Sequence, residues 1–291
     1  MAAGGRWASE GTGPERSVEA HGPGPAALVV ICLLVMAMPL GLAAADTLVG
    51  ISVRAAAAIS GLVAMALAAR VRSRAALDVG LLTVLGSLIG FAPWLWQWPP
   101  VIALGWVALT APVSRRLLGP NPDGTRSWRA WAPLGRPDPA TWLLTAVTIL
   151  ASASALLAWA WLADLDTPVR RAFLEQLNEL PIWVVAAWLV AFPLVNAAVE
   201  EIIYRGVVQG ALQQTLGKAT WAVLLQAVVF GGAHYHGNPG GFAGVVLATG
   251  YGAMLGVIRL RSRGLLAPWI AHVCADITIA VVLLSLLAQQ F

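Results

Sequence analysis

Charged side chains are scarce in this chain. Only 11% of its 291 residues are Asp, Glu, Lys or Arg, whereas a soluble domain carries about 25%. Hydrophobic residues make up 59% of the chain, and the mean hydropathy is +0.77. This composition excludes an ordinary soluble enzyme and predicts an all-α, polytopic transmembrane helix bundle.

Cysteine is also scarce, and several common motifs are missing. The two cysteines, Cys32 and Cys274, both lie in apolar segments, so we expect neither a disulfide framework nor a thiolate zinc site. The sequence has no P-loop, no dinucleotide fingerprint and no convincing internal repeat. The excess of 18 Lys and Arg over 14 Asp and Glu is explained by basic cytoplasmic loops, so it predicts no nucleic-acid partner.

Apolar segments long enough to span a bilayer recur along the chain. A span needs about 20 such residues, and we expect eight or nine spans. The candidates are 26–45, 50–69, 75–92, 98–114, 141–163, 181–204, 219–236, 241–259 and 264–289. Placing the N-terminus inside puts most basic residues on the cytoplasmic side. We therefore expect an integral, multi-pass membrane protein in contact with the lipid bilayer.

The spans and the polar stretches between them divide the chain into five predicted parts. Residues 1–25 form a disordered cytoplasmic tail, and 26–119 form the N-terminal transmembrane helices. Residues 120–140 are a polar linker rich in Pro and Gly, and 141–179 are an accessory span with an amphipathic surface segment. Residues 180–291 form the core, which holds the last four helices of the chain.

Glu200 and Glu201 lie side by side in an apolar stretch. Carboxylates within a membrane span are costly and usually face a bundle interior. If 181–216 and 219–234 form a helical hairpin, Glu201 and His234 both lie roughly 22 Å from its turn, at about 1.5 Å per residue. His272 lies roughly 14 Å from the next turn. The depths agree if the first hairpin extends about 8 Å into the cytoplasm, which brings the acids and histidines into one layer.

Three pairs with helical i,i+4 spacing support this layer. They read Glu-Glu-x-x-x-Arg, Phe-x-x-x-His and His-x-x-x-Asp, each in an apolar segment. The residues are Glu200-Glu201-Ile202-Ile203-Tyr204-Arg205-Gly206, Phe230-Gly231-Gly232-Ala233-His234 and His272-Val273-Cys274-Ala275-Asp276. In this order they make residues 180–290 resemble the CPBP or Abi group, the CAAX prenyl endopeptidase type 2 and bacteriocin-processing proteins.

The resemblance implies an intramembrane endopeptidase of the bacterial inner (cytoplasmic) membrane. Its catalytic core would be formed by the last four helices, and Glu201 would activate water. Its substrate would be a membrane-associated protein or peptide, cleaved near a membrane anchor, a lipidated end or a sorting or leader segment. The third motif has Asp276 where the prenyl-protein enzymes have Asn, while many bacterial members have Asn or Asp. This departure weakens the inference that the substrate is prenylated.

The acids admit two interpretations. Glu200 and Glu201 could form a structural ion pair with Arg205. Alternatively, one acid stays protonated or pairs with Arg205 while the other acts as a base, because burial and like charge both raise a carboxylate pKa. We favour the second interpretation, with Arg205 orienting Glu201.

The histidines are also open to two interpretations. His234, one turn after Phe230, is either a satisfied core histidine or a group that positions water or binds a metal. His272 and Asp276 are either a structural hydrogen-bonded pair or stabilisers of the tetrahedral oxyanion, with Asp276 orienting His272. We favour the catalytic interpretation of both.

A metal and two other functions remain open from the sequence. Glu201, His234 and His272 could hold a divalent ion such as zinc, but there is no His-Glu-x-x-His motif. The family resembled has been described both as metal-dependent and as a metal-free glutamate peptidase, and we favour the metal-free mechanism. The alternatives to an enzyme are an inactive membrane immunity or scaffold protein and a proton-coupled transporter.

Overall fold

Every described secondary-structure element in the computed structural model is a helix, as the composition predicts. The structure describes residues 48–89, 99–120, 131–163, 175 and 179–288. The predicted tail at 1–25, the candidate span at 26–45 and nearly all of the amphipathic segment 164–180 lie outside these residues.

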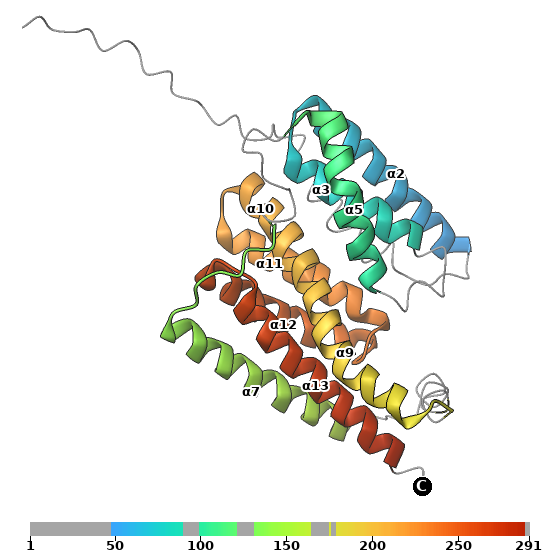
Figure 1. Cartoon of the computed structure of the whole chain (residues 1–291), viewed down its shortest axis with the longest axis vertical. Coiled ribbons are helices and arrows are strands. Elements are labelled where there is room, and N and C mark those ends of the chain that lie inside the picture. Colours follow the sequence, from blue (N-terminus) through green and yellow to red (C-terminus); the bar gives the residue numbers. More distant parts are fainter. Residues whose placement is uncertain (1–47, 90–98, 121–130, 164–174, 176–178, 289–291) are drawn as a thin grey trace, which may run out of the picture.

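Three helices form an N-terminal group at one side of the molecule (Figure 1). They are α2 (Leu48–Arg70), α3 (Arg74–Ile89) and α5 (Pro99–Leu118), and α3 packs against both of the others. They match the candidate segments 50–69, 75–92 and 98–114. Through α3 and α5 this group contacts the C-terminal helices.

The remaining helices form the C-terminal group. They are α7 (Pro139–Leu162), α9 (Ile182–Glu200), the π-helix η1 (Glu201–Val208), α10 (Gln209–Leu216), α11 (Ala219–Ala233), the 3₁₀ turn η2 (His234–His236), α12 (Gly241–Ser262) and α13 (Leu266–Ala288). Helix α9, η1 and α10 together form one continuous helix from Ile182 to Leu216, as expected. Gly217 ends it in a left-handed conformation (φ +63°), a common helix terminator.

Five described helices are long and apolar enough to cross a membrane. They are Leu48–Arg70, Pro139–Leu162, Ile182–Leu216, Gly241–Ser262 and Leu266–Ser285. The expected count of eight or nine spans is therefore not confirmed. Of the four other candidates, 26–45 lies outside the described residues, α3 and α11 have only 16 and 15 residues, and α5 ends in Arg115 and Arg116.

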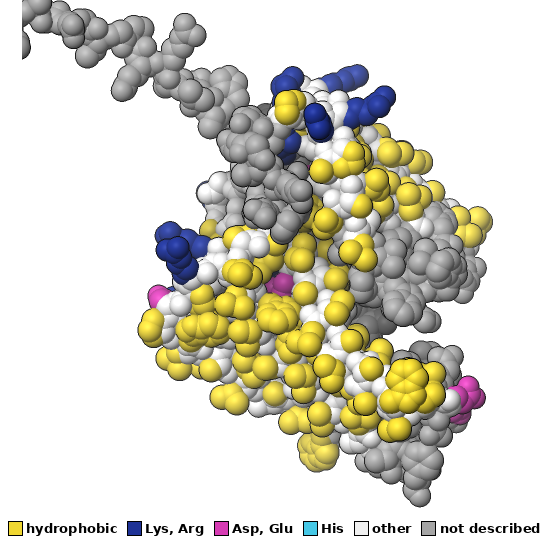
Figure 2. Space-filling view, viewed as in Figure 1, with side chains coloured by type: hydrophobic (Ala, Val, Ile, Leu, Met, Phe, Trp, Pro, Cys, Tyr) yellow, Lys and Arg dark blue, Asp and Glu magenta, His cyan; other side chains and the backbone are white. Residues whose placement is uncertain are grey.

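The side chains on the surface are distributed as in a membrane protein. Hydrophobic side chains cover much of the described face, and Lys and Arg gather toward its upper and left edges (Figure 2). The last turns of α2, α5 and α12 carry basic residues, namely Arg70, Arg115, Arg116, Arg259 and Arg261. These are three of the helix ends that the charge pattern assigns to the cytoplasmic side.

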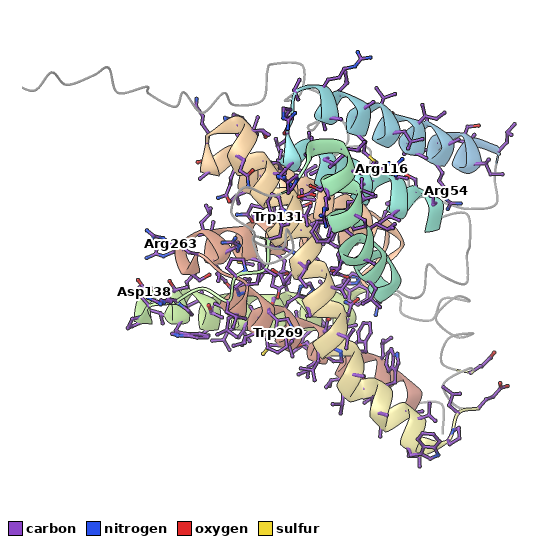
Figure 3. All side chains as sticks on the ribbon, turned by 45° about the horizontal axis from the view of Figure 1, so that its top comes forward. Arg54, Arg116, Trp131, Asp138, Arg263 and Trp269 are labelled. Carbon is purple, nitrogen blue, oxygen red and sulfur yellow. The ribbon has the colours of Figure 1, made fainter. Side chains whose placement is uncertain are left out.

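Trp131, in the predicted linker, joins the two helix groups (Figure 3). Its indole Nε1 donates to the buried Asp78 carboxylate of α3 at 2.6 Å. Its ring covers Gly210, where an added Cβ would lie 2.5 Å from ring carbon Cζ3. Its backbone covers Gly206 in the same way. Because both positions are glycine, the linker can pack directly against the helix that carries the first motif.

Replacing Trp131 by Phe is expected to lower the free energy of unfolding by about 1–3 kcal/mol, because Asp78 would stay buried without its donor. Denaturant unfolding in detergent micelles measures this. The double variant Asp78→Asn/Trp131→Phe should lose less, since an uncharged amide is cheaper to leave unpaired. Equal losses in the single and double variants would contradict the assigned hydrogen bond.

The start of α7 gives a pH-dependent prediction. The Asp138 carboxylate caps the helix by accepting from the Thr141 backbone N at 2.7 Å and from its hydroxyl. These hydrogen bonds lower the pKa of Asp138 below its ordinary value. The cap should therefore persist through the usual Asp range and fail only as pH falls through the lowered pKa.

Hydrogen exchange at the Thr141 amide follows this loss. Asp138→Asn is the control, because its amide also caps but does not titrate. Protection of Thr141 that is equally insensitive to acid in both proteins would contradict the assignment.

Candidate active site

The first motif lies where the continuous helix Ile182–Leu216 changes from α-helical to π-helical winding. Glu200 ends α9, and Glu201 opens the π-helix, which continues through Arg205 to Val208. Short π-helical segments inside α-helices occur often at functional sites. The sequence predicts one helix here but not this change of winding.

Glu201 and Arg205 form a buried ion pair. Their exposed fractions are 1% and 0%, and Arg205 Nη1 lies 2.9 Å from Glu201 Oε1. Nη1 makes this contact without an aligned hydrogen bond to any described residue. The guanidinium also lies 4.2 Å from the centre of the Phe230 ring, and its Nη2 donates to the Gly252 carbonyl at 3.5 Å. The i,i+4 pair expected from the sequence is thus present, with a cation–π contact beside it.

His272 binds to the same carboxylate oxygen. Its Nδ1 lies 2.8 Å from Glu201 Oε1, so a hydrogen on Nδ1 donates to the carboxylate. Its other nitrogen, Nε2, lies 3.7 Å from Glu200 Oε2 and 3.8 Å from Asp276 Oδ1. Both separations exceed hydrogen-bond length. One buried histidine therefore faces three acids and is fixed by one of them.

This arrangement differs from the expectation that Asp276 orients His272. Glu201 makes the orienting hydrogen bond, while Asp276 Oδ2 accepts from Asn196 Nδ2 at 3.2 Å. Asn196 was not among the predicted site residues. Its signal in the sequence is a single amide within the apolar stretch that precedes the acids.

The second motif joins the cluster through Phe230. Its ring lies 4.4 Å from the His234 ring, 5.9 Å from the His272 ring and 5.0 Å from the Tyr204 ring, measured between centres. His234 Nδ1 lies 2.8 Å from the Phe230 carbonyl. Because a carbonyl only accepts, Nδ1 carries the hydrogen, and Nε2 keeps a lone pair.

A cavity of about 330 Å³ borders this cluster. Its polar lining includes His234, Tyr251, His272 and Asp276, and most of its remaining wall is apolar. Helix α7 contributes part of that wall through Ala151, Ser152, Ala155 and Leu156. Among the described residues that line the cavity, neither Glu200 nor Glu201 appears, so Glu201 is connected to it through His272.

The predicted metal ligands do not converge in this structure. No three His, Cys, Asp or Glu side chains among the described residues are arranged to hold one ion. His272 Nδ1 is committed to Glu201, and His234 Nδ1 to a backbone carbonyl. Each histidine keeps its Nε2, but the set Glu201, His234 and His272 does not converge on one point among the described residues, so it does not fit a shared metal in this geometry.

The fold and the site define a class: an integral membrane protein with a buried acid–histidine cluster beside an apolar cavity. Residues 181–278 match the family of Rce1-like type II CAAX prenyl endopeptidases. The match spans all three motifs and confirms the CPBP resemblance. This part of the chain is thus similar to a domain of a membrane protease family. No curated protein and no solved structure matches the chain.

Proposed function

We propose that the chain is an endopeptidase that hydrolyses a peptide bond within the membrane. Its substrate is a membrane-associated protein or peptide, cleaved near a membrane anchor, a lipidated end or a sorting or leader segment. The main observation in favour of this proposal is that the Glu201 carboxylate is buried and contacts both Arg205 and His272. It lies beside the cavity that His272 lines.

Glu201 is suited to accept a proton on one defined oxygen. Arg205 and His272 both contact Oε1, whereas Oε2 has no hydrogen-bond partner among the described residues. Oε2 therefore keeps lone pairs for a proton from water. A positioned general base of this kind accelerates hydrolysis typically about 10²- to 10⁴-fold.

The reaction then proceeds in two steps. Glu201 takes a proton from water as the water oxygen bonds to the substrate carbonyl carbon, and the carbonyl π pair moves onto its oxygen. His272 stabilises this oxyanion. The oxyanion then re-forms the C=O bond, the C–N bond breaks, and the nitrogen takes the proton from Glu201. The products are a carboxylic acid and an amine.

Two neighbours support these steps. Glu200 Oε2 lies 3.7 Å from His272 Nε2, which places a second carboxyl group beside the histidine. His234 lines the cavity with its Nε2 lone pair available, so it can accept a hydrogen from the attacking water and position it.

Comparative mass spectrometry of membrane-protein termini tests this function. The samples are cells with the wild-type protein, Glu201→Gln or a deletion, with Glu179→Gln as a matched control at an exposed acid. A terminus lost equally in Glu201→Gln and the deletion, but kept in the control, supports proteolysis and identifies a substrate.

Two other outcomes would point elsewhere. Unchanged termini in all samples, with normal protein levels, would favour the scaffold or immunity function. A flux driven by a pH gradient and lost in Glu201→Gln would favour the transporter.

A further inference from the structure

The motif residues provide few donors for the oxyanion. His272 Nδ1 is already bound to Glu201, which leaves only Nε2 for the substrate. An ionised Asp276 has no hydrogen to donate, and its Oδ2 already accepts from Asn196. A negative oxygen next to this aspartate needs a second donor, because oxyanion sites act through several convergent hydrogen bonds.

Tyr251 of α12 lies where such a donor is needed. It lines the same cavity as His272 and Asp276. Its ring stands nearly perpendicular to the His272 ring, at 87°, with the ring centres 5.8 Å apart. The two side chains are therefore neighbours on one wall of the cavity, although they come from different helices.

The Tyr251 hydroxyl is also unused within the folded chain. Its oxygen is buried and makes no hydrogen bond to any residue that the structure describes. A buried polar group left unpaired destabilises the folded protein, so a phenol in this position needs a compensating role. The ring alone could be supplied by phenylalanine, which would avoid that cost.

We propose that Tyr251 is a catalytic residue whose hydroxyl donates a hydrogen bond to the oxyanion formed when water adds to the substrate carbonyl. This role rests on the proposed endopeptidase function and deepens it. A tyrosine hydroxyl, with an ordinary pKa of about 10, keeps its hydrogen at neutral pH. In the apolar cavity this hydrogen bond is stronger than it would be in water.

The test removes only the hydroxyl. With the substrate identified from the termini, Tyr251→Phe should lower kcat on the order of 100-fold, as loss of one oxyanion donor does, while KM stays near the wild-type value. The melting temperature in detergent should not fall, because the lost oxygen had no partner. Tyr204→Phe is the matched control, since this buried tyrosine does not line the cavity.

A second variant tests whether the Tyr251 hydroxyl acts as a hydrogen-bond donor. Asp276→Asn places an amide donor in the same part of the cavity, so it should restore part of the kcat lost in Tyr251→Phe. A merely structural role for the hydroxyl would predict no such rescue.

The outcomes separate this inference from the proposed function. Activity lost in Glu201→Gln but unchanged in Tyr251→Phe overturns the role of Tyr251 alone. A raised KM with unchanged kcat, or a lowered melting temperature that accounts for the loss, also overturns it. If wild type and Glu201→Gln show the same termini, the endopeptidase function fails, and the Tyr251 role fails with it.

Discussion

Glu201→Gln is expected to lower kcat for peptide hydrolysis by about 10²- to 10⁴-fold, the contribution of a positioned general base. Glutamine keeps the shape and an oxygen that can accept from Arg205 and His272, but it cannot take a proton from water at neutral pH. The protein should therefore fold and bind substrate while failing in the chemical step. Purified variants with the identified substrate give kcat and KM separately.

Glu200→Gln is the matched comparison for this result. Glu200 Oε2 lies 3.7 Å from His272 Nε2 and makes no hydrogen bond with it, so it neighbours the histidine without fixing it. We expect a smaller loss of kcat than in Glu201→Gln. The opposite order would reassign the base to Glu200.

Arg205→Met should destabilise the protein by about 3–5 kcal/mol, because it removes the guanidinium that pairs with the buried Glu201 carboxylate. Methionine preserves much of the apolar volume beside Phe230 while removing the charge. Thermal and denaturant unfolding in micelles measure the loss. Activity should also fall, since Glu201 Oε1 would lose one of its two contacts.

A double variant separates charge from packing in this prediction. Arg205→Met/Glu201→Gln removes both charges and should recover much of the lost stability, because a neutral amide is far cheaper to bury than a carboxylate. It should remain inactive. Equal stability in the single and double variants would show that the guanidinium acts through its packing on Phe230 and not through the ion pair.

The sequence predicts those features of the site that depend on local helical periodicity. The Glu201–Arg205 pair is found as expected, and His234 contacts Phe230 one turn earlier. Eight candidate spans coincide with described helices to within a few residues at most boundaries. Each of these inferences needs only the helical repeat and the positions of apolar residues.

The missed features depend on how distant helices fit together. Which acid fixes His272 is decided by the rotation of α13 against η1, and i,i+4 spacing favours Asp276 whatever that rotation is. The Asn196–Asp276 contact joins residues 80 positions apart, and the Trp131–Asp78 contact joins residues 53 apart. The span count is not confirmed partly because apolar composition alone does not distinguish the short helices α3 and α11 from longer spans.

The wall that α7 contributes to the cavity lies outside the matched segment 181–278. The reactive groups and part of the space beside them are thus encoded in separate stretches of the chain. Changes at Ala151 or Ala155 can alter the shape of that space while leaving every acid and histidine of the cluster in place. Two proteins with the same three motifs can therefore differ in what they admit, and comparison of their motifs alone would not show it.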